Sequence, residues 1–261
     1  MIIPLNGPSE PQGQNMTSVR SRAFAALLAV VPTAGLMAVA SPAQAATLDI
    51  TVKSVAVSKS VFVLGSKAGC QSFTITAVTS EPIPTAGYEI AGVGADINAP
   101  GGKTVKGGQF AQVGSTATYK GTFKMCGKDT AGRWTIEVYG AQLAAGDDEP
   151  ELTNLVSKSI YLKRPSKLTL NAAPEPVVKG KKLTAKGVLK VNGKVLGGAK
   201  VKVYFKPAGA TTFTYKGTAT TNGKGVYSKK FTATKTGVWQ VVYAGGAARN
   251  AATAVDGVKV K

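Results

Sequence analysis

The sequence of 261 residues contains no histidine. This absence removes the commonest general base, the serine–histidine nucleophile pair and most catalytic zinc sites. A serine–lysine pair is the remaining route to an activated nucleophile. Serines with a lysine nearby, such as Ser60 and Ser157, stand in no recognisable nucleophile elbow. We therefore expect a protein that is not an enzyme, with no catalytic residue and no cofactor.

Cysteine is also scarce, because the chain has only Cys70 and Cys126. Two sulfurs without any histidine make a poor metal site, so we expect no bound metal. In a chain exported to an oxidising compartment, an isolated pair favours a disulfide over two buried thiols, which are the alternative. We predict that Cys70 and Cys126 are joined.

Long apolar runs are absent except for one near the N-terminus, residues 23–40. Arginines precede this run, and the small-x-small pattern of a signal peptidase site follows it at residues 41–45. Residues 1–46 therefore read as an upstream extension and a secretory signal peptide. Because no second long apolar run follows, we expect no membrane span and a secreted protein, extracellular or associated with the cell envelope.

From residue 47 onward, short segments of alternating apolar and polar residues are separated by glycine, proline, asparagine and serine. This spacing is typical of the strands of a β-sandwich and not of helices. The segments expected in the first half are 48–57, 60–64, 71–79, 87–93, 108–113, 116–125, 133–140 and 155–163. Those expected in the second half are 167–172, 183–190, 200–206, 212–220, 226–233, 238–243 and 254–260.

The two halves repeat one motif, which indicates two similar domains. Each copy has a tyrosine and a phenylalanine four residues apart, then Gly-x-Trp and a further tyrosine. The first copy has three more residues than the second between its phenylalanine and its glycine. The copies are Tyr119, Phe123, Gly132, Trp134 and Tyr139, and Tyr227, Phe231, Gly237, Trp239 and Tyr243.

A proline at position 165 separates the two copies, since it ends one alternating run before the next begins at Leu168. We predict one Ig-like β-sandwich with a disulfide over residues 47–164 and a basic one over residues 165–261. The expected fold class is all-β, with two tandem Ig-like β-sandwich domains after a disordered or helical N-terminal signal peptide.

The second half resembles a known group of proteins through Leu168-Thr169-Leu170-Asn171, the run from Pro174 to Thr184, the later Gly-x-Trp and the terminal Val258-Lys259-Val260. These residues are similar to the C-terminal domain of uncharacterised secreted proteins of actinobacteria, in which an Ig-like domain precedes it. The resemblance implies a tandem Ig-like fold and export, and it carries no activity or site residues. No tryptophan follows the first cysteine at antibody spacing, so a transthyretin-like sandwich is the alternative for the second domain.

Positive charge is concentrated in the second half. Residues 47–165 hold 12 lysines and arginines against 10 acidic residues, whereas residues 166–261 hold 18 against 2, a net charge of +16. Such a domain attracts polyanions at low salt. All but one of its cations are lysine, which lacks the fork geometry of arginine and favours loose association over specific nucleic-acid recognition. Strand alternation places lysines on outer faces, and the candidate polyanion-binding residues are Lys182, Lys186, Lys190, Lys200, Lys202 and Lys206.

Two functions remain open at this stage. The first is a non-catalytic secreted protein that associates with an anionic cell-wall polymer or other extracellular polyanion through its C-terminal domain. The alternative is a structural or adhesion-type module that binds a protein partner through its N-terminal domain. The lysines could also serve only solubility. The one acidic cluster, residues 147–151, reads as a solvated loop, although a calcium site is its sharper interpretation.

Overall fold

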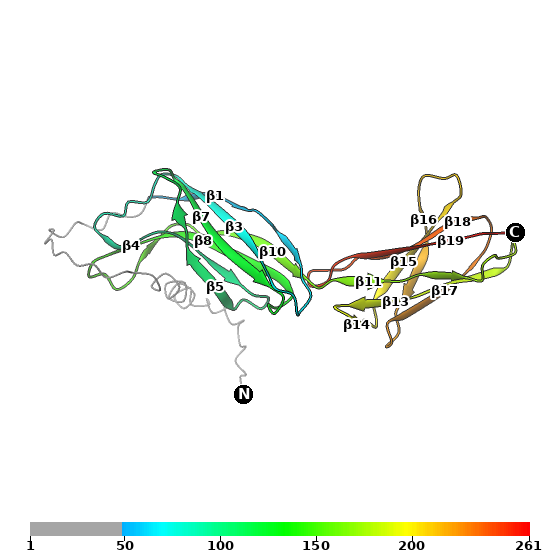
Figure 1. Cartoon of the computed structure of the whole chain (residues 1–261). Helices are drawn as coiled ribbons and strands as arrows, with labels where there is room; N and C mark the ends of the chain where they lie inside the picture. The colour runs from blue at the N-terminus through cyan, green and yellow to red at the C-terminus, as the bar shows by residue number, and fades with distance from the viewer. Residues whose placement is uncertain (1–48) are drawn as a thin grey trace, which may run out of the picture.

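The computed structural model describes residues 49–261 as strands and loops, arranged as two β-sandwiches placed end to end (Figure 1). The predicted extension and signal peptide, residues 1–46, lie outside the described residues. Within the described part of the chain, no helix has the length and apolar character needed to cross a bilayer.

The first sandwich packs two sheets face to face. One sheet has the order β1-β3-β7-β6, and the other has the order β2-β10-β8-β4-β5 with β9 beside β8. This is the A-B-E-D and A′-G-F-C-C′ order of an immunoglobulin-like domain. The strands are β1 (Val52–Val57), β2 (Val61–Val63), β3 (Cys70–Thr79), β4 (Tyr88–Asn98), β5 (Thr104–Gln109), β6 (Ala111–Gln112), β7 (Thr118–Cys126), β8 (Gly132–Ala144), β9 (Glu151–Leu152) and β10 (Val156–Lys163).

The second sandwich has the same plan. In one sheet β13 is central, with β11, β12 and β14 paired to it as well as β17, and the other sheet has the order β16-β15-β18-β19. This order corresponds to strands A-B-E and C′-C-F-G of an Ig-like domain, which is the fold predicted for this half of the chain. Its strands are β11 (Ser166–Leu168), β12 (Asn171–Ala173), β13 (Lys182–Val191), β14 (Lys194–Val195), β15 (Lys200–Pro207), β16 (Thr214–Thr220), β17 (Val226–Thr232), β18 (Gly237–Tyr243) and β19 (Ala252–Val258).

The strands form where the sequence alternates, because each sheet buries one face against its partner. In β18 every second residue from Gly237 to Tyr243 is buried, and Trp239 and Val241 belong to the second core. The first core is separate and centres on Trp134, Phe62 and Ile75. Two hydrophobic cores in one chain agree with two tandem sandwiches.

Two strands run further than their predicted segments. β4 continues to Asn98 and β8 continues to Ala144. The extra segment of each strand pairs with the predicted part of the other. Several polar residues in the extra segments are buried, including Asp96 and Gln142. Asp96 and Asn98 still alternate with Ala95 and Ile97 here, but both faces of the strands are covered, so alternation no longer separates a core face from a solvent face.

The repeated motif is placed similarly in both sandwiches, with one correction. Trp134 and Trp239 both point into a core, from β8 and β18. Tyr139 follows its tryptophan by five residues, whereas Tyr243 follows by four, and a shift of one residue turns a side chain to the opposite face. Tyr243 therefore joins the second core, while Tyr139 lies in a small separate cluster outside the first. The predicted equivalence of these tyrosines is wrong.

Arg164 and Asn192 join the two sandwiches. The Arg164 guanidinium donates to the carbonyl oxygens of Leu64 and Asp129 in the first sandwich, at 2.9 and 2.5 Å, while its own backbone pairs with the 248–250 loop of the second. Asn192 accepts a hydrogen bond from the Ser66 amide at 3.0 Å and donates one to the Ser66 hydroxyl at 2.7 Å. The joint is thus polar and small.

The Asn192 contact depends on a tight turn that the sequence predicted. Asn192 and Gly193 form the two-residue connection between β13 and β14, with φ values of 50° and 79°. Positive φ at both positions is the type I′ geometry that favours Asn-Gly. The turn presents the Asn192 side chain to Ser66 and so links local sequence to the joint between sandwiches.

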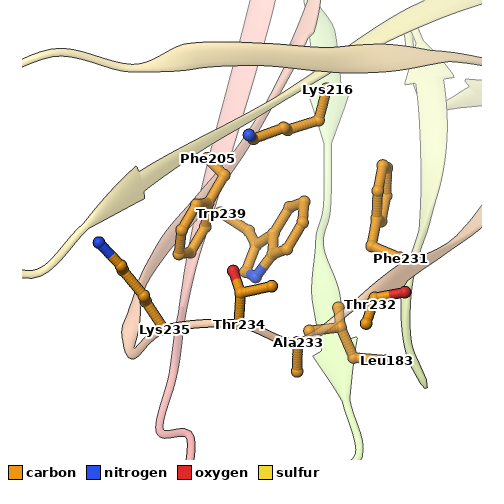
Figure 2. A pocket seen from close by; sticks show the side chains of 9 residues that line it. All are labelled: Leu183, Phe205, Lys216, Phe231, Thr232, Ala233, Thr234, Lys235 and Trp239. Carbon is orange, nitrogen blue, oxygen red and sulfur yellow. The ribbon is translucent and has the colours of Figure 1, made fainter. Parts of the chain in front are cut away.

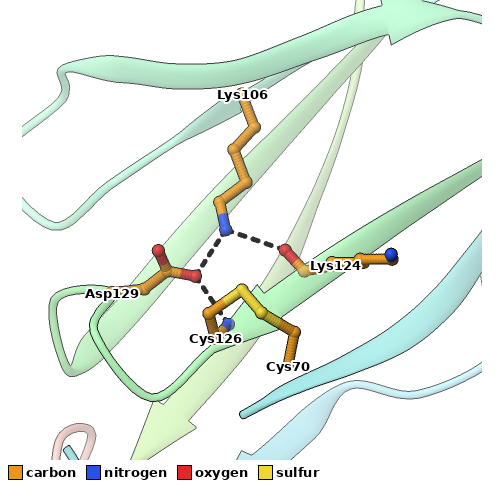
Figure 3. Close-up of a disulfide and its surroundings, with 5 residues drawn as sticks. All are labelled: Cys70, Lys106, Lys124, Cys126 and Asp129. Atoms are coloured by element: carbon orange, nitrogen blue, oxygen red, sulfur yellow. Dashed lines mark hydrogen bonds and ion pairs between the residues drawn. A yellow bond between two sulfur atoms is a disulfide. The ribbon is translucent and has the colours of Figure 1, made fainter.

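The predicted disulfide between Cys70 and Cys126 is present (Figure 3). The two residues are directly opposite one another on β3 and β7, with their Cα atoms 3.9 Å apart. The bond therefore joins neighbouring strands of one sheet, whereas an antibody-type disulfide joins the two sheets. Asp129 lies beside it, forms an ion pair with Lys106 and accepts a hydrogen bond from the Cys126 amide at 2.7 Å.

Replacing both cysteines with serine should destabilise the first sandwich and leave the second unchanged. The bond closes a loop across a sequence separation of 56 residues, for which loop closure contributes about 3–4 kcal/mol. Calorimetry should show one transition moved to lower temperature and one unmoved. A single transition that moves as a whole would contradict independent folding of the two sandwiches.

Candidate functional site

The six candidate lysines lie on two opposite faces of the second sandwich. Lys182, Lys186 and Lys190 are exposed on β13, which belongs to one sheet, whereas Lys200, Lys202 and Lys206 are on β15, which belongs to the other. The core-facing residues that alternate with them are Leu183, Ala185 and Leu189 on β13 and Val201, Val203 and Phe205 on β15. The structure therefore brings together three lysines at a time and not all six.

The β13 face carries the longer row of charge. Its three lysines are four residues apart and span about 27 Å along the strand. Lys167 of β11 is directly opposite Lys190, and Lys230 of β17 is opposite Thr184, between the other two lysines. Paired residues of antiparallel strands share a face, so this face carries five lysines. None of the five forms an ion pair with a carboxylate among residues 49–261.

The β15 face combines lysine with exposed aromatic rings. Tyr204 lies between Lys202 and Lys206 and contacts Tyr215 of β16, with ring centroids 5.7 Å apart. Tyr215 is 53% exposed. The Lys206 ammonium is 5.2 Å from the centroid of the Phe213 ring, a cation–π contact that holds it against the loop before β16. This face is thus less purely electrostatic than the β13 face.

The lysines of the second sandwich have no carboxylate partners. Its two acidic residues are engaged with backbone, because Asp256 accepts from the Ala172 amide at 2.7 Å and Glu175 accepts from the Lys259 amide at 3.1 Å. In residues 49–261 the one ion pair is Lys106 with Asp129, in the first sandwich. The net charge of +16 is therefore presented to solvent with little internal compensation.

Sequence analysis missed a polar cluster on the first sandwich. Asp96 of β4 is directly opposite Glu137 of β8, and the Asn98 amide donates to Glu137 at 2.9 Å. Asp96 is 5% exposed and its Oδ1 has no hydrogen-bond partner. Burial and the neighbouring Glu137 raise the Asp96 pKa from 3.8 to about 6. The polar residues Asp96 and Asn98 at alternate positions of β4 were the available signal, but they read equally as a solvated face.

Asp96→Asn should flatten the pH dependence of stability in the acid range. The pKa of Asp96 is higher in the folded protein than in the unfolded chain, so the folded state binds more protons between pH 3.8 and about 6. Stability should therefore fall as pH rises through that window, by at most about 3 kcal/mol. Urea unfolding from pH 3.5 to 7 would measure this, and an unchanged slope in the variant would assign the effect elsewhere.

The acidic loop is exposed at Asp147, Asp148 and Glu149 and half-buried at Glu151. Among residues 49–261, no three aspartate, glutamate, histidine or cysteine side chains come together in a way that could hold a metal ion. The arrangement fits the solvated loop better than the calcium site.

Known proteins show only a weak structural likeness to this chain. No protein-family model matches the chain, and no curated protein sequence matches it. A marsupial T cell receptor has a TM-score of 0.40 at 11% identity, covering 81% of this chain and 73% of the receptor. The Escherichia coli adhesin FdeC has 0.31 at 20%, covering 78% and 63%, and the Yersinia pseudotuberculosis adhesin InvE has 0.31 at 11%, covering 82% and 59%.

These neighbours are immunoglobulin-like and adhesin-type β-sandwich proteins. At such identities the likeness concerns the sandwich architecture and indicates neither a partner nor an activity. The resemblance to secreted actinobacterial proteins stays a prediction.

Proposed function

We propose that this protein is a non-catalytic secreted module whose second sandwich, residues 165–261, associates with an anionic extracellular polymer such as a cell-wall polymer. The observation that carries the proposal is the uncompensated charge of that sandwich, which exposes lysines on both outer faces and engages both of its carboxylates with backbone. An extended polyanion can contact such a surface along a whole strand.

Secretion is part of the proposal and is supported by the disulfide. Disulfides persist in oxidising compartments outside the cytosol, and Cys70 and Cys126 form one here. The predicted signal peptide gives the route. In such a location the available polyanions are wall polymers, acidic polysaccharides, anionic lipid head groups and released DNA, and lysine charge alone distinguishes poorly among them.

Association should be strongest at low salt and should depend on the second sandwich. Screening shortens the range of exposed charges from about 10 Å at 0.1 M salt to about 3 Å at 1 M. We expect retention of the purified protein on Gram-positive wall material to fall steeply over that range. Changing Lys182, Lys186 and Lys190 to glutamine should weaken it on the order of tenfold, at about 0.5 kcal/mol per exposed charge.

The control variants remove the same charge elsewhere. One control variant tests the opposite face by changing Lys200, Lys202 and Lys206 to glutamine. The other tests exposed lysines of the first sandwich by changing Lys53, Lys120 and Lys158 to glutamine. An equal loss of retention in the first-sandwich variant would show that retention depends on net charge alone and not on the lysine faces of the second sandwich. No retention even at low salt would overturn the proposal and leave the lysines as a solubility feature.

The second candidate function is an adhesion-type module that binds a protein partner through the first sandwich. One observation favours it, because Val61 and Val63 are each 40% exposed on the same side of β2, an edge strand of the first sandwich. Exposed apolar residues on an edge strand can mark an interaction site. Binding of this kind would persist at high salt, which separates it from the first candidate.

A further inference from the structure

A small cavity opens between the two sheets of the second sandwich, at the end of the sandwich away from the joint (Figure 2). Its volume is about 150 Å³. Ligand sites for drug-sized molecules are usually about 300–1,000 Å³, so this cavity admits one small chemical group. Its lining comes from five strands and one loop and consists of Leu183, Phe205, Lys216, Phe231, Thr232, Ala233, Thr234, Lys235 and Trp239.

Three aromatic rings form the wall of this cavity. The Trp239 ring lies between those of Phe205 and Phe231, with centroid distances of 4.8 and 4.6 Å (Figure 2). Lys216 and Lys235 stand at its rim, where both side chains are exposed. The site thus has an apolar wall and a cationic mouth.

The indole N–H of Trp239 has no acceptor among residues 49–261, unlike its counterpart in the first sandwich. There the Trp134 Nε1–H donates to the Thr130 carbonyl oxygen at 2.9 Å. Buried tryptophan N–H groups usually find a partner. The unused donor of Trp239 is therefore available to a ligand or water.

The sequence explains this difference. Of the three extra residues of the first motif copy, two lengthen β7 and one lengthens its connection to β8, which includes Thr130 and supplies the acceptor for Trp134. The shorter connection between β17 and β18 runs from Ala233 to Thr236 and lines the cavity instead. The tryptophan of the motif is thus enclosed in the core of the first sandwich, whereas its equivalent in the second sandwich borders an opening.

Donor groups surround the opening and carboxylates do not. Lys216 and Lys235 bring ammonium groups, Thr234 brings a hydroxyl and Trp239 brings its N–H. The Thr232 hydroxyl instead accepts a hydrogen bond from Lys182 at 2.8 Å. No acidic side chain lines the cavity. Such a set matches an oxyanion, and hydrogen bonds from ammonium groups to an oxyanion are the stronger kind. Aromatic faces carry partial negative charge, so they accept the C–H groups of a ring or polyol.

We propose that this cavity binds one anionic unit of the polymer, a hydroxylated ring or polyol that carries a carboxylate or phosphate. Its oxyanion lies between Lys216 and Lys235, and an oxygen accepts from the Trp239 N–H. This inference rests on the proposed function and adds a defined subsite to a surface otherwise held by diffuse charge.

The test uses the two tryptophans of the chain as matched reporters. With only Trp134 and Trp239 present, the ¹⁵N-labelled protein gives two indole N–H signals, which a Trp239→Phe variant assigns. The probes are a trimer of galacturonic acid and a trimer of glycerol phosphate, which share the oxyanion and separate the two sources of it. We expect either probe to shift the Trp239 signal and leave the Trp134 signal in place.

Charge-matched variants test the role of the rim. Lys216→Gln combined with Lys235→Gln should weaken probe affinity roughly tenfold, as expected for losing hydrogen bonds between charged groups. Lys53→Gln combined with Lys158→Gln removes the same charge from exposed positions of the first sandwich and should change the probe affinity less than twofold. An unmoved calorimetric transition of the second sandwich verifies that each variant is folded.

The outcomes separate this inference from the proposed function. If long wall polymer binds in a salt-dependent way but neither trimer moves the Trp239 signal, the cavity assignment is wrong and the charged-face proposal stands. Equal losses of probe affinity from the rim pair and the first-sandwich pair would also overturn the assignment. In the third outcome, a trimer moves the Trp239 signal while long polymer binds the outer-face variants as tightly as the unchanged protein. The cavity assignment is then correct, and the outer faces do not contribute to binding.

Discussion

The structure depends on a single constraint, that each long strand has one face against the opposite sheet and one face away from it. In β13, Leu183, Ala185 and Leu189 are fully buried while the lysines between them are exposed. Because β15 obeys the same rule in the opposite sheet, its lysines must point the other way. A sandwich whose outer positions are lysine on both sheets is therefore basic on both faces, and no arrangement of loops could gather its charge on one.

Sequence patterning predicted the strands well wherever one face of the sheet meets solvent. The segments expected at 183–190, 200–206 and 238–243 lie within one residue of β13, β15 and β18. Patterning failed where both faces are covered, at the ends of β4 and β8, because alternation there no longer marks a face that meets solvent. It could not assign lysines to faces, since pairing of sheets is a tertiary property. The cavity was also out of reach, because it depends on a missing acceptor for Trp239 and not on any residue type.

The joint between the sandwiches determines where the first sandwich lies relative to a polymer bound at the cavity. Asn192, which contacts Ser66, follows the C-terminal end of β13, whereas Leu183, which lines the cavity, lies near its N-terminal end. Nine residues of extended chain separate them by about 30 Å. The first sandwich is therefore held at the end of the second that is remote from the cavity, and it cannot block the opening. It would project away from a surface bound there, as the end-to-end arrangement in Figure 1 suggests.

Diffuse charge and a small cavity would contribute to binding in different ways. Lysine rows attract a polyanion over about a Debye length and tolerate many registers, but they weaken as salt rises. A contact with a buried group is screened less than a contact with an exposed one. At high ionic strength the contact with the Trp239 ring should thus retain more of its contribution than the contacts of the exposed lysines, Lys216 and Lys235 included. The difference follows from geometry, because Trp239 is 4% exposed whereas the lysine side chains lie in solvent.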